Sequence, residues 1–171
     1  MIPISHLLSS IFILRIITIF FPTATFNFQT ILLSMGFQIL PDLDIFRAKK
    51  LNSHHVTYFH SPLFWIIIFT VLFVFNQFFS IVPIWLILLF IIQVLMHLFF
   101  DFMTGRAAGI PLLYPFIKKE FSILPLNKNH GNFKPFSLKD EIKFLKYYLK
   151  SKSQILFELT VWILGIISLL V

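Results

Sequence analysis

Two uncharged apolar runs stand in the middle of the chain: PLFWIIIFTVLFVFNQFF at residues 62–79 and IWLILLFIIQVLMHLFF at residues 84–100, joined by SIVP at 80–83. Each run is close to the roughly 20 residues that an α-helix needs to cross the hydrocarbon core of a bilayer. The short link leaves room for nothing but a tight turn. These runs therefore predict a helical hairpin that crosses a membrane twice.

The composition of the whole chain also favours a membrane protein. Of its 171 residues, 58% are hydrophobic and only 12% are charged, and the mean hydropathy is +0.89. A soluble domain of this size cannot bury so much apolar surface. The chain has no cysteine, which excludes disulfides, thiolate metal sites and cysteine nucleophiles.

Three further apolar stretches flank the hairpin, at about residues 7–21, 31–40 and 155–171. We interpret the first as a retained membrane segment, because Arg15 lies inside the run and no small-residue cleavage site is clear. The second is too short for an untilted span, so we expect it to be tilted, extended toward Phe26, or partly re-entrant. The prediction is an all-α, polytopic helical bundle of four to five membrane segments, forming one membrane domain over residues 1–171.

Residues 137–152 predict a helix of a different kind. Leu138, Ile142, Leu145 and Leu149 recur at helical spacing after Ser137, and lysines lie between them. This pattern is typical of an amphipathic helix that lies on anionic lipid. We expect it to brace the last span, at about 155–171, rather than to capture substrate.

The basic residues predict how the chain is oriented. Thirteen of the 14 lie in residues 41–61 and 101–154, and Arg15 is the exception. The hairpin places both segments on one side of the membrane, and the positive-inside rule makes that side cytoplasmic. If the first two stretches also form a hairpin, His6 lies on the same side and the C-terminus on the other. The net charge of +7 thus reflects orientation, and we expect no nucleic-acid binding, because no polar basic module is visible.

Histidine and aspartate gather where the apolar runs meet these cytoplasmic segments. Burying such groups near a bilayer edge is costly unless they are paired or coordinated, which makes the cluster a candidate site. His97 and Asp101 share one helix face at positions i and i+4. Pro41 disfavours a helical Leu40, so we expect the carboxylates of residues 42 and 44 on an extended segment.

Each of these motifs, taken alone, also fits a helix cap or a solvated turn. Their conjunction is more informative, because three separate segments present nitrogen and oxygen ligands to one membrane face. That ligand set suits zinc, with manganese or iron as alternatives.

The motifs resemble those of the membrane-bound metal-dependent hydrolases described as LexA-regulated inner-membrane proteins, the YdjM-like family. The matching elements, in chain order, are Ser5-His6-Leu7-Leu8, Leu40-Pro41-Asp42-Leu43-Asp44, His55-Val-Thr-Tyr-Phe-His60-Ser61, His97-Leu-Phe-Phe-Asp101-Phe-Met-Thr104 and Gly109-Ile-Pro-Leu-Leu-Tyr-Pro115. The resemblance covers roughly residues 1–125, which would form the metal-site core.

The resemblance implies a set of candidate metal ligands. These are His6, Asp42, Asp44, His55, His60, His97 and Asp101. Seven groups exceed the need of one tetrahedral zinc ion, so the resemblance allows one or two divalent ions. A carboxylate outside the ligand set, Asp44 or Asp101, would act as general base.

The third motif departs from the family pattern. Val56-Thr57 replaces Arg-Gly, and Phe59 stands where the family has threonine. If that arginine holds a substrate anion, another cation such as Arg106 or Lys118 must replace it here.

The favoured function is a metal-dependent hydrolase at the cytoplasmic face of the inner membrane. Because the site lies at the lipid edge, the expected substrate is a phospholipid or another phosphate ester. A metal-binding membrane protein without catalysis, such as a transporter component or a regulatory anchor, is the alternative. A purely structural protein is a third reading, which predicts no stoichiometric metal.

Overall fold

The computed structural model of the chain describes residues 3–47, 57–104, 108–124, 126, 134 and 137–170. The described helices are, in chain order, α1 (Pro3–Phe20), α2 (Phe28–Ile39), the 3-10 helix η1 (Leu40–Arg47), the 3-10 turn η3 (Tyr58–His60), α3 (Pro62–Phe79), α4 (Ile84–Thr104), α5 (Leu138–Tyr148) and α6 (Lys152–Leu170). Four of them, α1, α3, α4 and α6, are long and apolar enough to cross a membrane. The predicted all-α membrane bundle is confirmed.

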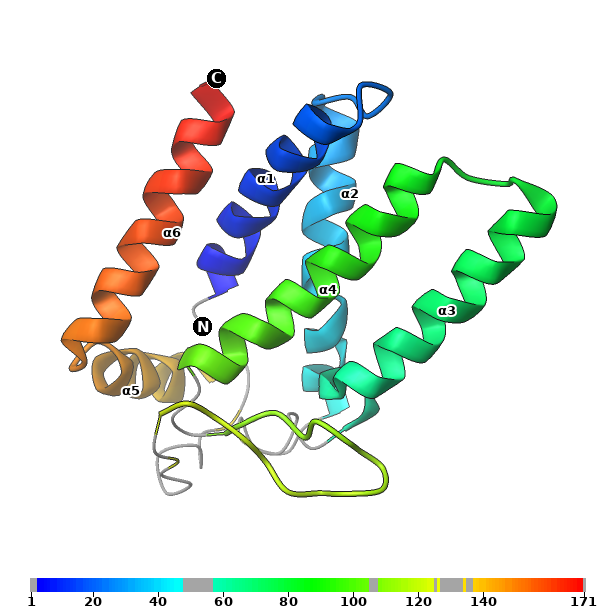
Figure 1. Cartoon of the computed structure of the whole chain (residues 1–171). Helices are drawn as coiled ribbons and strands as arrows, with labels where there is room; N and C mark the ends of the chain where they lie inside the picture. Colours follow the sequence, from blue (N-terminus) through cyan, green and yellow to red (C-terminus); the bar gives the residue numbers. More distant parts are fainter. Residues whose placement is uncertain are drawn as a thin grey trace.

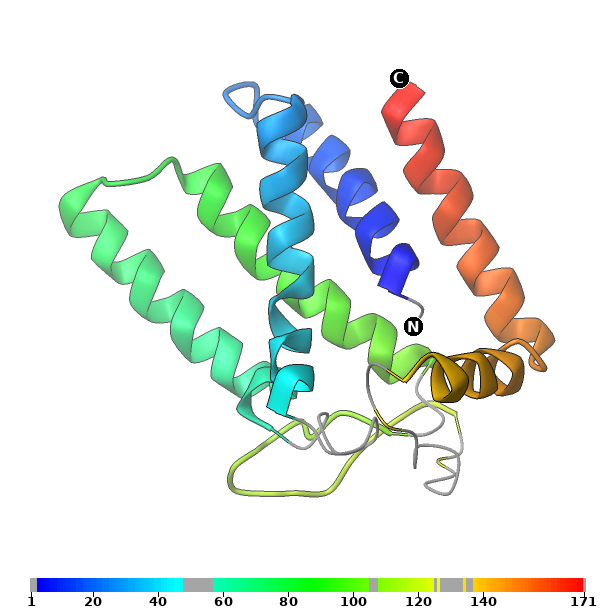
Figure 2. The same cartoon turned by 180° about the vertical axis from the view of Figure 1, so that it is seen from behind.

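The helices are arranged around α4, which packs against α1, α2 and α3, while α6 packs along α1. Figure 1 places the start of α1, η1, the start of α3 and the end of α4 at one end of the bundle, and the C-terminus at the other. Helix α5 lies across the first of these ends. Figure 2 shows the opposite side, where α2 runs directly into η1. We call the end that carries His6, η1, η3 and Asp101 the polar end.

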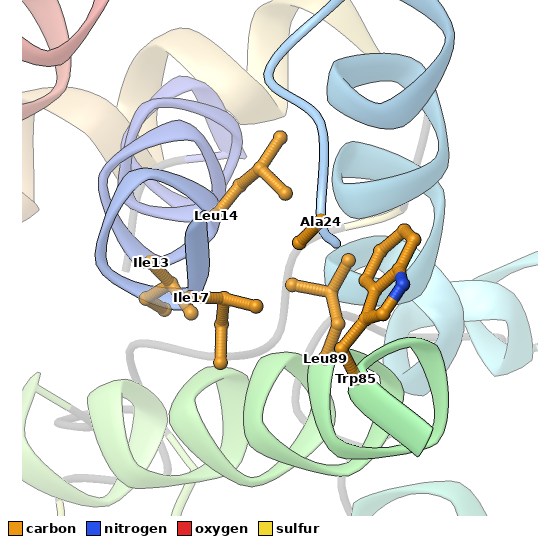
Figure 3. Packing of buried hydrophobic residues seen from close by; sticks show 6 residues of the cluster. All are labelled: Ile13, Leu14, Ile17, Ala24, Trp85 and Leu89. Carbon is orange, nitrogen blue, oxygen red and sulfur yellow. The ribbon is translucent and has the colours of Figure 1, made fainter. Parts of the chain in front are cut away.

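An apolar core fills the space between α1, α4 and the link before α2. Figure 3 shows its side chains pointing toward one another from these segments. The buried members of this core are Ile13, Leu14, Ile17, Ala24, Trp85 and Leu89. Because dispersion contacts need close packing, this core fixes the distance between α1 and α4.

A buried polar network joins α1, α2 and α4 between this core and the polar end. Gln93 on α4 and Ser34 on α2 both donate to the carbonyl oxygen of Ser10, each at 2.9 Å. Gln38 on α2 donates to the Ser9 hydroxyl at 3.3 Å. Hydrogen bonds between helices also set their rotation, since a rotated helix would leave these groups unpaired in an apolar surrounding.

The second apolar stretch forms a helix of only 12 residues, α2, and is not among the four candidate spans. Asn27 begins it with a capping box, in which its side chain accepts from the Thr30 backbone and the Thr30 hydroxyl accepts from the Asn27 backbone. At 1.5 Å per residue α2 covers roughly 18 Å, well short of the hydrocarbon thickness. Among the described residues the bundle therefore has four candidate spans, the lower number predicted.

The expectation of an extended segment at Leu40 is wrong. Leu40 is helical, with φ −49° and ψ −42°, and its backbone N–H donates to the carbonyl of Phe37. The chain continues from α2 into η1 without a break. Pro41 fits here because it falls in the first turn of the new helical segment, where its fixed φ is already suitable and no N–H is needed.

Helix α5 occupies Leu138–Tyr148, a shorter range than the predicted 137–152. Ser137 precedes it, but its hydroxyl makes no capping bond; its carbonyl oxygen instead accepts from the backbones of Asp140 and Glu141, each at 2.9 Å. The apolar residues of the predicted stripe, Leu138 to Leu149, are largely exposed. This exposure fits the expected amphipathic helix.

The loop after α4 returns to the polar end and is tied there. Ile110 and Phe121 exchange two backbone hydrogen bonds of 2.9 Å. A Cβ atom at Gly109 would lie 2.4 Å from the carbonyl oxygen of Phe121, so only glycine permits this approach. The hydroxyl of Ser61, next to η3, donates to the carbonyl of Tyr114 at 3.1 Å.

Close contact between α6 and α1 depends on Gly165. A Cβ atom there would lie 2.6 Å from the carbonyl oxygen of Leu8. We expect Gly165→Ala to destabilise the protein by about 1–3 kcal/mol, because backbone atoms must move apart. The measurement is thermal unfolding in detergent. Gly36→Ala is the matched control, since nothing lies within 4 Å of its added Cβ, and its Tm should be unchanged or higher. Equal Tm values for both variants would contradict the close packing.

Candidate metal centre

The polar end gathers the predicted site residues from four elements. His6 comes from α1, Asp42 and Asp44 from η1, His60 from η3, and His97 and Asp101 from α4. Helix α1 starts at Pro3, before the predicted Leu7, so His6 lies within it. The seventh predicted ligand, His55, lies outside the described residues.

Four of these side chains can share one metal ion: Asp42, His60, His97 and Asp101. One ligand atom from each lies within 4.8 Å of the other three. The Nε2 atom of His60 is 3.5 Å from Asp42 Oδ1 and 3.8 Å from Asp101 Oδ2. The Nε2 atom of His97 is 3.5 Å and 3.2 Å from the same two oxygens.

These separations suit a tetrahedral ion. Zinc bonds of 2.0–2.2 Å to nitrogen and oxygen place neighbouring ligand atoms roughly 3.3–3.6 Å apart. The four histidine–carboxylate separations, from 3.2 to 3.8 Å, bracket that value. Two neutral imidazoles and two carboxylates also make a ligand set that zinc, manganese and iron accept. The residues present therefore fit a divalent metal.

The burial of the four residues supports the same conclusion. The side chains of His60 and His97 are 0% exposed, and that of Asp101 is 5% exposed. The Nε2 atom of His97 lies between the carboxylates of Asp42 and Asp101. Buried imidazole and carboxylate groups are costly unless they are paired or coordinated. Asp42, 30% exposed, is the side from which solvent reaches the group.

Asp44 lies behind His60 rather than beside the four ligand atoms. Its Oδ2 atom is 3.1 Å from His60 Nδ1 and also accepts a hydrogen bond from the Thr57 hydroxyl. A carboxylate on the far nitrogen fixes the tautomer and orientation of a ligating histidine. Thr57 is one of the residues that depart from the family motif. Its hydrogen bond fixes the position of the Asp44 carboxylate, which in turn orients His60.

His6 approaches the group from the other side. Its Nε2 atom is 3.4 Å from Asp101 Oδ1, the carboxylate oxygen that does not face His60 and His97. The rings of His6 and His97 are stacked, with centroids 4.0 Å apart. His6 is thus placed to orient Asp101, or to hold a second ion together with Asp101.

Neighbouring charges and hydrogen bonds shift the pKa values of Asp42 and His60, two site residues that lie outside the membrane spans. Burial by itself raises the pKa of Asp42, but the charge of His97 and hydrogen bonds with His60 and His97 hold that pKa well below its usual range. Burial lowers the pKa of His60, whereas hydrogen bonds to Asp42 and Asp44 raise it above the ordinary value overall. Without metal His60 therefore retains its proton to higher pH than a free histidine, and metal binding at Nε2 must displace that proton.

Sequence reasoning missed a second group of polar residues near the site. Glu158 on α6 is 4% exposed and bonded to Ser5, the residue before His6. A lone carboxylate inside the last apolar run was the available signal, because charges inside spans are rarely without a role. Of the cations considered as substitutes for the missing arginine, Lys118 is exposed on the loop, and Arg106 lies outside the described residues.

Fold and site together define a polytopic membrane protein with a group of four residues able to hold a metal at one end of its helices. A family model described as YdjM inner membrane protein matches residues 1–171, the whole chain. The chain belongs to this family. No curated protein and no solved structure matches it.

The metal centre predicts stoichiometric binding, on the order of one ion per chain. We expect His97→Ala and Asp42→Asn, each of which removes a ligand, to weaken Zn²⁺ binding by at least about a hundredfold, and Asp44→Ala by about 10- to 100-fold. The measurement is elemental analysis of purified protein together with competition against a fluorescent chelator.

Asp140→Asn supplies the matched control. Its carboxylate lies on α5 and pairs with Lys143 at 3.8 Å, so this variant should bind Zn²⁺ as the wild type does. Wild-type protein without stoichiometric metal, after supplementation with zinc, manganese or iron, would contradict the site.

Proposed function

We propose that the protein is a metal-dependent hydrolase of the inner membrane that acts on a phospholipid or another phosphate ester. The observation that carries this proposal is the convergence of two histidines and two aspartates, whose histidine–carboxylate separations of 3.2 to 3.8 Å match those expected around a tetrahedral ion. A divalent ion bound there would lower the pKa of a coordinated water toward neutrality and polarise the scissile phosphoryl group.

The protein residues take distinct parts in this proposal. His60 and His97 are the fixed ligands, since both are fully buried and His60 is held by Asp44. Asp42 borders solvent, so water and substrate would enter beside it. Asp101 is the preferred general base where Asp42, His60 and His97 alone hold the ion, because its Oδ1 atom then lies free of the ion, 3.4 Å from His6 Nε2. Asp44 is less suited to that part, because His60 and Thr57 already engage its Oδ2 atom.

The alternative is a metal-binding membrane protein without catalysis. Four ligands from the chain complete a tetrahedral site, which is the arrangement of structural zinc, whereas catalytic zinc keeps a position for water. Hydrolysis in this site requires a fifth position or the release of the exposed Asp42. A transporter component is less well supported, because transporter ligands lie near the bilayer midplane and here they lie at one end of the helices.

We further propose that the metal centre faces the cytoplasm. The described basic residues of α5 and of the loop after α4 lie at the polar end, and an excess of lysine and arginine is retained on the cytoplasmic side. A substrate at this position is either a headgroup of the inner leaflet or a soluble phosphate ester.

Hydrolysis is tested with purified protein loaded with zinc or manganese. Nitrophenyl phosphate, bis-nitrophenyl phosphate and vesicles containing phosphatidic acid report phosphomonoesterase, phosphodiesterase and lipid activity. We expect one of them to be cleaved, and His97→Ala and Asp42→Asn to lower that rate by at least about a hundredfold, or roughly 3 kcal/mol. Stoichiometric metal with no cleavage of any of them would favour the non-catalytic alternative.

Orientation is tested by cysteine labelling, which is clean because the chain has no cysteine of its own. Lys143→Cys on α5 should react with an impermeant maleimide only in inverted vesicles. Ser80→Cys, at the exposed turn between α3 and α4, should react only in spheroplasts. The reverse pattern would place the metal centre on the outer side.

A further inference from the structure

The C-terminal helix α6 carries a carboxylate inside the bundle. The side chain of Glu158 is buried, and its Oε1 atom accepts a hydrogen bond of 2.5 Å from the Tyr148 hydroxyl. Its Oε2 atom accepts from the hydroxyl of Ser5, and Ser5 in turn accepts from Trp162 Nε1 at 2.6 Å. A carboxylate in a candidate membrane span is expensive to maintain. The hydroxyls of Tyr148 and Ser5 donate to Glu158, and Trp162 donates to Ser5. These donors compensate the cost of burying the carboxylate and indicate a specific role for it.

This network reaches the metal centre through α1. Ser5 immediately precedes His6, and His6 contacts both Asp101 and the ring of His97. Ser5 is itself fully buried. The position of the first turn of α1, and with it the His6 ring, therefore depends on the bond between Ser5 and Glu158.

A second contact from the same face of α6 reaches α4. Gln154, one turn before Glu158, donates to the backbone carbonyl of Thr104 at 2.7 Å. Thr104 ends α4 less than one turn after Asp101. Helix α6 is thus hydrogen-bonded to the start of α1, which carries His6, and to the end of α4, which carries His97.

The third member of the network comes from the helix that lies across the polar end. Tyr148 is the buried residue of α5, whereas Leu138 and Ile142 on the same helix are exposed. Burial beside Glu158 raises the pKa of the Tyr148 phenol, so the phenol keeps its proton and donates it. The hydrogen bond to Glu158 therefore connects α5 to α6.

We propose that Glu158 is a positioning residue for the metal centre. With Tyr148 and Ser5 it fixes the start of α1, so that His6 orients Asp101 as a metal ligand, and it makes metal affinity depend on the seating of α5. This inference rests on the metal centre of the proposed function. It does not depend on whether the centre is catalytic.

The test is Zn²⁺ affinity, measured by competition with a fluorescent chelator, in Tyr148→Phe, Ser5→Ala, Glu158→Gln and Glu158→Leu. We expect Tyr148→Phe, Ser5→Ala and Glu158→Leu each to weaken Zn²⁺ binding about tenfold, the lower bound for groups that orient ligands. Glu158→Gln keeps an oxygen acceptor and should recover most of the affinity. The visible spectrum of the Co²⁺-loaded protein should change in the same three variants, because it reports the ligand geometry.

Two controls separate positioning from general stability. Tyr147→Phe removes the neighbouring phenol while leaving Tyr148, Ser5 and Glu158 in place, and should bind Zn²⁺ as the wild type does. Asn76→Ala removes two hydrogen bonds to Val82 at the turn between α3 and α4, at the end opposite the metal centre, and should lower Tm while leaving Zn²⁺ affinity unchanged.

The outcomes are distinct. If Zn²⁺ affinity follows Tm across all variants, Asn76→Ala included, Glu158 is merely structural and the inference fails. If wild type and Tyr148→Phe bind Zn²⁺ equally, the inference fails while the metal centre stands. If the wild type holds no metal, both proposals fall together.

Discussion

Asp101 ends an otherwise apolar helix, and its carboxylate is almost completely buried there. A charge in that position requires partners, because neither lipid nor an apolar core solvates it. His97 and His60 face one of its oxygens and His6 faces the other. The contacts that stabilise the Asp101 carboxylate therefore bring α1, η3 and α4 together. Asp42 and Asp44 on η1 lie beside the same histidines.

Hydrogen bonds between helices, about one turn from the site, fix the rotation of α1, α2 and α4 about their axes. Ser9 and Ser10 follow His6 on α1, Gln38 precedes Asp42, and Gln93 precedes His97, and all are joined by hydrogen bonds between helices. Below them the apolar core around Leu89 sets the spacing (Figure 3). Precision at a ligand site requires such support, because a helix that turned by one residue would carry its ligand away by about 100°.

The departures from the family motif have a local explanation in part. Thr57 stands in place of a glycine, and its hydroxyl donates a hydrogen bond to Asp44. This bond helps to fix the position of the carboxylate that orients His60. The replacement of the arginine by Val56 concerns a residue outside the described part of the chain. The element around Gly109 retains the feature that requires glycine, since the backbone of Phe121 lies where a side chain would stand.

The sequence by itself determined the membrane character, the hairpin of α3 and α4 with the limits of α3 at Pro62 and Phe79, and the common face of His97 and Asp101, because these depend on local hydrophobicity and on the period of a helix. It placed the end of α4 at Phe100, four residues before its end at Thr104. It could not determine that Leu40 is helical. A residue before proline prefers an extended backbone, but here the helix continues from α2 into η1 and outweighs that preference. Nor could it assign Asp44 to the back of His60 or Ser5 to Glu158, which are 16 and 153 residues apart in sequence. Which atoms meet across such separations is decided by how the helices pack, and only the tertiary structure contains that information.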